Sequence, residues 1–162
     1  MPWTSDGQTE RSMQFHRNPL DTIVITQQFG ISPATYRRFG LPGHNGVDLR
    51  TRFWDSPFGH RECYAILDGK VREIRWDRTG YGFHVRVDHA EGWMTLYAHL
   101  RRVSVARGQE IRAGDVIGIT DSTGFSFGHH LHFELRAPGW EQKGPKEYYG
   151  AVDAAPYFLA TR

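Results

Sequence analysis

The amino-acid sequence predicts a mainly β protein, a compact domain of antiparallel sheet with at most short helices. Glycine occurs 18 times and proline 8 times in 162 residues, and such frequent breakers favour short strands joined by turns. The segments between them are rich in β-branched and aromatic residues, which are enriched in strands. Several segments also alternate apolar and polar side chains, as a strand with one buried face does.

The first elements of this domain follow in order along the chain. Residues 21–26 form a β-branched run that is typical of a strand. A short helix is expected over residues 32–40, with Ser32 as its N-cap and Pro33 in its first turn. Residues 50–62 contain many aromatic residues and breakers, and we expect a loop there.

Most of the sheet is expected after this loop. The predicted strands are residues 63–67, 70–75, 83–89, 93–100, a short strand between the turns at 107–108 and 113–115, 116–120 and 128–136. Residues 90–92 provide a hairpin turn between two of these strands. A segment rich in Gly and Pro, residues 137–150, then leads to the closing stretch 152–159.

Composition narrows the class of protein and of partner. Hydrophobic residues at 39% and charged residues at 23% are typical of a globular domain. The net charge of +2 and the lack of a Lys/Arg cluster predict no nucleic-acid partner. Cys63 is the only cysteine, which excludes an intrachain disulfide and a thiolate metal cluster. No apolar run approaches the roughly 20 residues of a membrane span, so no transmembrane segment is expected.

The length suits one domain. Residues 1–19 are polar and lack periodicity, so we expect an N-terminal polar arm followed by a single domain over residues 20–162. The N-terminus also lacks the basic and then apolar layout of a secretory signal. If the substrate lies outside the cytoplasm, we expect another route of delivery.

Strand alternation assigns the histidines near residue 130 to faces. Side chains two apart on a strand share a face, which places four polar residues together: His130, His132, Glu134 and Arg136. Three apolar residues lie opposite and should meet the core: Leu131, Phe133 and Leu135. His129 points away from the polar group. In residues 94–100 the same count places Thr95, Tyr97 and His99 opposite an apolar face.

His44 and Asp48 lie four residues apart and can converge on one ion, whether on a strand or a helix. With His130 and His132 they form a nitrogen and oxygen donor set that suits zinc. If all four bound, the ion would be closed and structural, whereas a hydrolytic zinc keeps one position for water. The spacing leaves both arrangements open.

Four stretches carry a resemblance to a known family: His44-Asn45-Gly46-Val47-Asp48, Leu96-Tyr97-Ala98-His99-Leu100, Thr123-Gly124-Phe125-Ser126-Phe127-Gly128 and His130-Leu131-His132-Phe133-Glu134. In this order they resemble the lysostaphin/LytM-type zinc metallopeptidases, which cut peptide bonds in bacterial peptidoglycan. The resemblance runs from about Thr22 to Leu159.

The resemblance implies roles for five residues. His44, Asp48 and His132 would bind one zinc ion per chain, and His99 and His130 would be the catalytic pair. It also implies a lysostaphin-type sheet, of duplicated-hybrid or barrel-sandwich-like form, whose loops make a substrate groove. The domain of residues 20–162 would then be a zinc metallopeptidase domain.

The expected function is a zinc-dependent endopeptidase that hydrolyses peptide cross-links or stem peptides of peptidoglycan through a metal-activated water. The alternative is a non-catalytic wall-binding or activator module on the same fold. We expect action at the bacterial cell wall or periplasm as a monomer, with delivery by a phage particle, a lysis system or a secretion apparatus. Four further histidines lack motif support and are expected to be ordinary surface or hydrogen-bonded residues: His16, His60, His84 and His89.

Overall fold

Short strands dominate the computed structural model, which describes residues 13–160. The strands are β1 (Ile25–Gln27), β2 (Val47–Arg50), β3 (Glu62–Tyr64), β4 (Gly69–Asp77), β5 (Gly82–Asp88), β6 (Met94–Val103), β7 (Glu110–Ile111), β8 (Val116–Thr120), β9 (His130–Arg136) and β10 (Ala151–Val152). The α-helix α1 covers Pro33–Tyr36, and 3₁₀ turns cover Arg37–Phe39, Ala90–Gly92, Trp140–Gln142, Pro145–Gly150 and Ala155–Tyr157. Within the described residues, no helix is long and apolar enough to span a bilayer.

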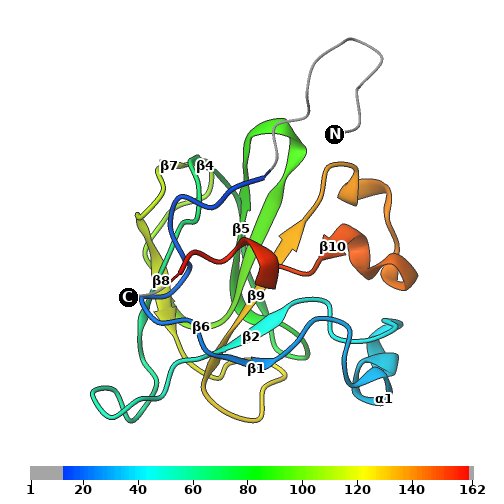
Figure 1. Ribbon diagram of the computed structural model, residues 1–162, viewed down its shortest axis with the longest axis horizontal. Coiled ribbons are helices and arrows are strands. Elements are labelled where there is room, and N and C mark those ends of the chain that lie inside the picture. The colour runs from blue at the N-terminus through cyan, green and yellow to red at the C-terminus, as the bar shows by residue number, and fades with distance from the viewer. Residues whose placement is uncertain (1–12, 161–162) are drawn as a thin grey trace.

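All these strands belong to one antiparallel sheet. Its main path runs β1-β2-β9-β6-β5-β4-β7, while β10 pairs with β9, and β8 pairs with both β6 and β3. Figure 1 shows β2, β9, β6 and β5 crossing the middle of the molecule, with α1 to one side. The predicted fold class, a mainly β antiparallel domain with short helices, is therefore confirmed.

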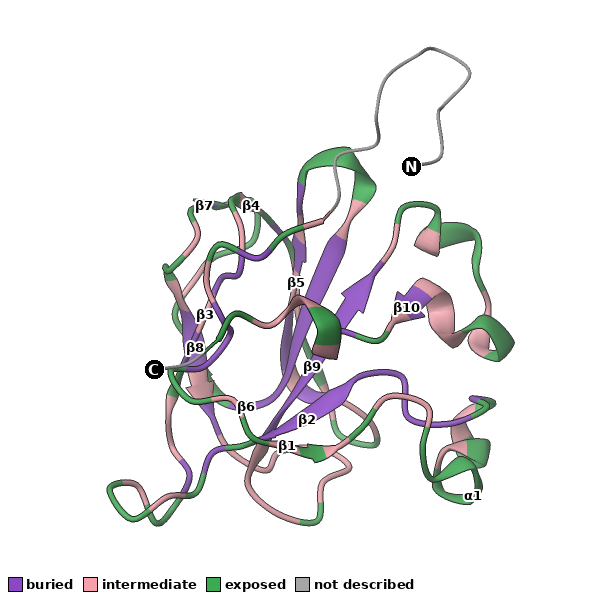
Figure 2. Cartoon of the chain, in the orientation of Figure 1, coloured by how far each residue is buried: buried purple, intermediate pink, exposed green. Residues whose placement is uncertain are grey.

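The core lies against one face of the central strands, which Figure 2 shows as buried. Leu131, Phe133 and Leu135 of β9 face it as predicted, and all three are fully buried. The Tyr97 ring packs edge-on against Phe133 with 5.3 Å between centroids. Burial of such side chains supplies most of the stabilisation of a domain this size.

The predicted faces of β6 are wrong. Tyr97 packs in the main core, whereas Met94, Leu96 and Ala98 form a second apolar cluster on the opposite face. By simple alternation His99 would follow Tyr97 into the core. Its φ of 63° places His99 in the left-handed region, which is uncommon for a residue other than glycine. This irregularity resets the alternation, so Leu100 returns to the core and His99 does not.

Two other elements differ from expectation. The predicted strand over residues 21–26 is replaced by the shorter β1, which pairs only with β2. The helix begins after Ser32 as expected, but Ser32 has a φ of 55° and makes no side-chain cap. Most of the predicted N-terminal arm, residues 1–12, lies outside the described residues. Of the rest, Phe15 is buried and stacks on Tyr157 with 5.8 Å between ring centroids.

Candidate metal centre and its pocket

The register of β2 against β9 brings the two sequence motifs together. Asp48 lies directly opposite His132 in this antiparallel pair, and paired residues on one face have neighbouring side chains. Gly46 allows the close approach, because a Cβ there would lie 2.8 Å from the His132 ring and 2.6 Å from the Phe133 carbonyl oxygen. The same alternation that sends Phe133 to the core sends His132 to the opposite face.

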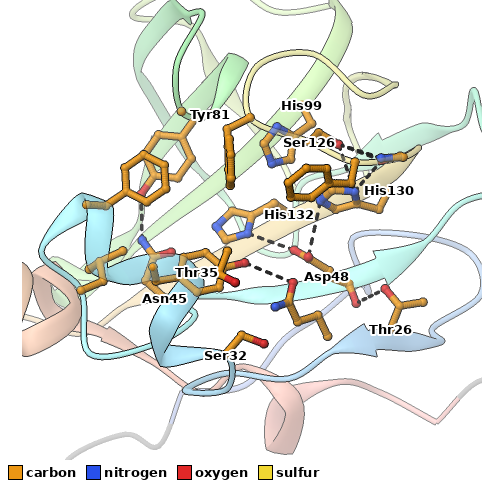
Figure 3. Close-up of a pocket in the computed structure, with 18 of the residues that line it drawn as sticks. Thr26, Ser32, Thr35, Asn45, Asp48, Tyr81, His99, Ser126, His130 and His132 are labelled. Carbon is orange, nitrogen blue, oxygen red and sulfur yellow. Dashed lines mark hydrogen bonds and ion pairs between the residues drawn. The ribbon is translucent and has the colours of Figure 1, made fainter.

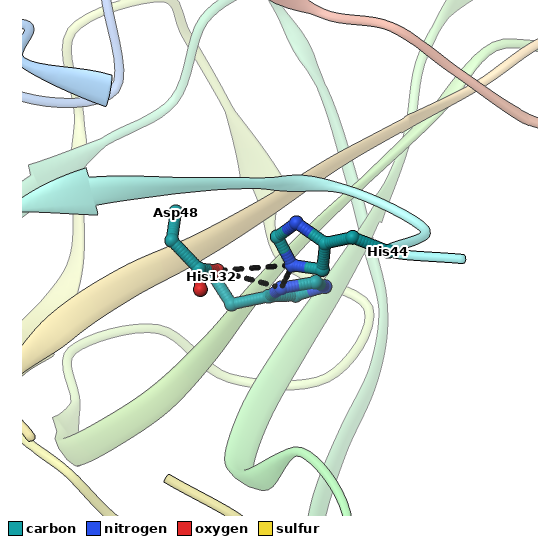
Figure 4. A group of neighbouring side chains, drawn as sticks. All are labelled: His44, Asp48 and His132. Carbon is teal, nitrogen blue, oxygen red and sulfur yellow. Dashed lines mark hydrogen bonds and ion pairs between the residues drawn. The ribbon is translucent and has the colours of Figure 1, made fainter. Parts of the chain in front are cut away.

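His44, Asp48 and His132 converge in a buried triad (Figure 4). The distances are 3.1 Å from Asp48 Oδ1 to His44 Nε2 and 3.1 Å from Asp48 Oδ1 to His132 Nδ1. His44 Nε2 lies 3.0 Å from His132 Nδ1. With bonds of about 2.0–2.1 Å, a tetrahedral zinc ion separates its ligand atoms by about 3.3–3.4 Å. The three atoms therefore fit one face of a zinc tetrahedron after only a small expansion.

Hydrogen bonds select the nitrogen that each imidazole turns toward this triad. His44 Nδ1 lies 3.0 Å from the carbonyl oxygen of Gln28. A carbonyl only accepts, so Nδ1 carries the proton and Nε2 keeps its lone pair. His132 has the opposite arrangement, since its Nε2 donates to Glu134 Oε1 at 2.9 Å and its Nδ1 faces Asp48. Partners of this kind orient metal-binding histidines and raise their basicity.

Glu134 is fully buried and accepts hydrogen bonds at both carboxylate oxygens. Besides His132, its Oε1 accepts from Tyr81 Oη at 2.6 Å and from Asn45 Nδ2 at 2.8 Å. Its Oε2 accepts from Arg136 Nε at 2.9 Å, and a second Arg136 nitrogen forms an ion pair with it at 2.8 Å. Burial raises the pKa of Glu134, but the Arg136 charge and the His132 hydrogen bond outweigh burial and hold the pKa well below its usual range. Glu134 is therefore an ionised anchor for the His132 ring.

In the metal-free triad, the pKa values of Asp48 and His132 depend on the contacts between them. Burial alone would raise the pKa of Asp48, but the hydrogen bond from His132 and the contact with His44 outweigh burial and lower the pKa strongly. Burial lowers the pKa of His132, but its hydrogen bonds to Asp48 and Glu134 outweigh burial and raise the pKa to about 9. The triad thus favours positive charge beside Asp48, whether a proton or a cation supplies it.

His99 and His130 stand next to the triad and outside it. Their ring centroids are 4.8 Å apart, and His130 Nε2 lies 3.5 Å from Asp48 Oδ2. His99 Nδ1 donates to the Thr123 carbonyl at 2.6 Å, and His130 Nδ1 donates to the Gly128 carbonyl at 2.7 Å. Both rings therefore keep an unprotonated Nε2.

Burial dominates the titration of this second pair. It lowers the pKa of His99 to about 3, with further lowering from neighbouring His130 and His132. Burial also lowers the pKa of His130, although Asp48 works against it. At neutral pH both imidazoles are neutral and can each take up a proton at Nε2.

The triad opens into a pocket of about 750 Å³. Figure 3 shows His99, His130 and His132 gathered on one side of it and Ser32 and Thr35 on the other. Its walls also include three aromatic residues from two loops: Phe125 and Phe127 from the loop before β9, and Tyr149 from the segment before β10. Its volume falls within the usual range for ligand sites, and its floor combines a candidate metal site with two proton acceptors.

All five predicted site residues meet in this region, from segments up to 88 positions apart. Sequence reasoning missed the residues that hold them in place. Strand alternation placed Glu134 and Arg136 beside His132, and a carboxylate two positions from a histidine on one strand face was a usable signal. For Asn45 and Tyr81 the contact with Glu134 depends on how distant segments meet in the fold.

Comparison with known proteins finds relatives of this chain. The profile of the family described as Peptidase family M23 matches residues 42–144. Over 124 residues the chain is 37% identical to the DD-carboxypeptidase/endopeptidase Mpg of Neisseria meningitidis serogroup B, an alignment that covers 68% of this chain and 27% of that protein. The chain therefore spans about a quarter of the length of the curated relatives that it matches.

Solved structures share the fold. A zinc-containing peptidase from Vibrio cholerae superposes with a TM-score of 0.69 at 29% identity, over 91% of this chain and 41% of that one. The catalytic domain of the antimicrobial peptidase lysostaphin from Staphylococcus simulans superposes with a TM-score of 0.66 at 26% identity. That match covers 83% of this chain and 91% of that domain.

Proposed function

The chain belongs to peptidase family M23, and from that premise we propose that it is a zinc endopeptidase that hydrolyses peptide bonds of bacterial peptidoglycan. The observation that carries the proposal is the buried triad of His44, Asp48 and His132 with ligand atoms 3.0–3.1 Å apart. Two neutral imidazoles and one carboxylate suit zinc. Three protein ligands also leave a position for water, as in hydrolytic sites.

In this proposal the three ligands hold one zinc ion, which when bound acidifies water and polarises a carbonyl oxygen. Glu134 keeps His132 in the tautomer whose Nδ1 faces the ion. His99 and His130 exchange a proton at Nε2 with the attacking water and the leaving amine. Their backbone acceptors, the carbonyls of Thr123 and Gly128, hold these rings in place throughout.

His130 supports the hydrolytic arrangement over a closed structural site. Among the described residues, the buried group whose ligand atoms all lie within 4.8 Å of one another contains His44, Asp48 and His132 without His130. A ring that stays outside the ligand set can serve a proton transfer. The pocket above the triad supplies space for an extended peptide between α1 and the loop that contains Phe125 and Phe127.

The remaining predictions extend the same proposal. We place its action at the cell wall, as a monomer with one catalytic zinc ion, and treat residues from 20 onward as a single domain. Delivery by a phage particle, a lysis system or a secretion apparatus stays a prediction. The bond that is cut, in a cross-link or a stem peptide, is to be read from the reaction products.

Digestion of purified cell walls tests the function. The zinc-loaded protein should release peptide fragments that mass spectrometry identifies, and a chelator should stop the release. His132→Ala should abolish release, whereas His16→Ala, at an exposed histidine far along the chain from both motifs, should leave it unchanged. Wall binding without any released fragment would instead support the non-catalytic module.

A further inference from the structure

A second group of metal-ligating side chains lies outside the triad. His60, Asp121 and His129 each offer a ligand atom, and these atoms all lie within 4.8 Å of one another. Asp121 Oδ1 is 3.3 Å from His129 Nδ1 and 3.7 Å from His60 Nε2. The two imidazole rings are 5.4 Å apart. We refer to these three residues as the outer cluster.

The backbone holds the outer cluster in place. Thr120 holds both neighbours of His60 in the chain. The Thr120 hydroxyl donates to the Gly59 carbonyl at 2.7 Å, and the Thr120 amide donates to the Arg61 carbonyl at 2.8 Å. Gly59, at a φ of 73°, permits close contact with the opposite loop, since a Cβ there would lie 2.8 Å from the His129 Cβ. Two loops that are distant in sequence are therefore fastened together at this point.

His129 provides a second, independent observation. Its Nδ1 is buried, and within residues 13–160 it has no hydrogen-bond partner. An unsatisfied buried polar atom destabilises the folded state, so native structures retain few of them. This nitrogen lies close to the Asp121 carboxylate at an angle that makes no hydrogen bond. A lone imidazole nitrogen beside a carboxylate is suited to bind a metal ion.

Arg101 is the group that competes with a cation. One of its terminal nitrogens lies 2.8 Å from His60 Nδ1 and 3.1 Å from His60 Nε2, and its Nε lies 3.9 Å from Asp121 Oδ2. Arginine only donates, so in this arrangement it occupies a lone pair of His60. The Arg101 side chain is 49% exposed, so solvent is open to it when a cation takes its place.

We propose that the outer cluster is a second metal site, which binds a divalent transition metal such as zinc once Arg101 turns away. Two imidazoles and one carboxylate favour zinc, copper or nickel over calcium or magnesium. Its ligand atoms are farther apart than those of the triad, so it binds the second and weaker equivalent. The backbone of Asp121 bonds to the carbonyl of His99 at 3.0 Å and to the amide of His130 at 3.3 Å. A metal ion here therefore stiffens the backbone beside both of these histidines.

Metal titration of the whole chain tests the proposal. The metal-free protein is titrated with Zn²⁺ in a calorimeter, and metal content after desalting is measured in parallel. The wild type should bind two equivalents. His129→Ala and His60→Ala should each weaken the second by at least about tenfold, the scale even of outer-shell losses at metal sites. His16→Ala is the matched control and should bind two equivalents.

Removal of the Arg101 charge should change the affinity for the second metal equivalent in a known direction. Arg101→Met should tighten the second equivalent about fivefold, the effect in water of removing one unit charge that has turned to about 8 Å from a divalent ion. Arg107→Met, at an exposed arginine in a turn, should not. A wild type that binds a single equivalent would overturn the proposal, as would a His129→Ala variant that still binds two with unchanged affinity. The triad is tested separately, because His132→Ala should retain the weaker equivalent.

Discussion

Replacing Glu134 by glutamine tests how the triad is held. The carboxylate accepts three hydrogen bonds at Oε1, and at Oε2 it accepts one from Arg136 Nε and forms an ion pair with a second nitrogen of the same guanidinium. Glutamine preserves the volume but has one accepting oxygen, so its NH₂ group must face either the three donors or Arg136. Directed toward Arg136, it leaves a buried guanidinium without its counter-charge. Directed the other way, it removes the acceptor that sets the His132 tautomer.

The structure sets the size of this effect. Removing one partner of a buried ion pair costs about 3–5 kcal/mol. For a chain of 162 residues that cost lowers the Tm by about 6–20 °C. Loss of an outer-shell partner of a metal-binding histidine weakens metal affinity by about 10–100-fold. Both losses are expected together, because the same carboxylate serves Arg136 and His132.

Two assays measure the outcome for Glu134→Gln. Circular dichroism melting curves give the Tm, and competition with a chromophoric chelator gives the zinc affinity. The matched control is Glu141→Gln, an exposed carboxylate 3.4 Å from Arg72, whose replacement should cost less than about 0.5 kcal/mol. If Glu134→Gln melts within 2 °C of the wild type and binds zinc within about twofold, the anchoring role of Glu134 is wrong. If the variant does not fold, Tyr81→Phe is the milder substitute, expected to cost about 1–3 kcal/mol.

Three more predictions concern titration, catalysis and thiol reactivity. In the metal-free protein the pKa of His132, about 9, lies above its ordinary 6.5. The contribution of protonated His132 to the stability of the fold is thus complete below pH 6.5 and is lost as the pH rises through 9. If the Tm of the metal-free protein stays constant over this interval, the assignment is wrong. His99→Ala and His130→Ala should keep the triad's zinc, measured by elemental analysis, and lose about 10²–10⁴-fold in rate on wall fragments; loss of that metal would place these rings among the ligands. Burial raises the pKa of Cys63 to about 12, so a thiol reagent at pH 8 should label it only after denaturation, and rapid labelling of the native protein would count against the buried position.

The sheet was predictable because its signals are local. The observed β8 has the bounds expected from its apolar run, and the core face of β9 follows from alternation along seven residues. The strand expected over residues 21–26 fails for the complementary reason. Strand propensity measures how a residue suits a pleated surface, and it says nothing about whether a partner strand is in reach.

His99 shows where a local rule breaks. Alternation assigned it to the pocket by reversing the true faces of β6, and the left-handed backbone at His99 then corrected the outcome. Such a residue shifts the strand by one position, and the parity of every later side chain changes with it. Nothing in the composition of the β6 segment indicates this conformation.

The sequence by itself determined the chemistry available to this protein. Histidine and aspartate at these spacings, on strands whose other faces are apolar, restricted the site to nitrogen and oxygen ligands beside the core. Periodicity and ligand preference depend on residue type alone, so both can be read from the sequence.

Only the tertiary structure decided which nitrogen each histidine presents. The acceptors that select it are the carbonyls of Gln28, Thr123 and Gly128 and the carboxylate of Glu134. The tertiary structure also brought His60 and His129, which had no motif support, to one carboxylate. A tautomer and a contact between loops both depend on where separate backbone segments meet, because hydrogen bonds act over about 3 Å and no spacing along the chain encodes that distance.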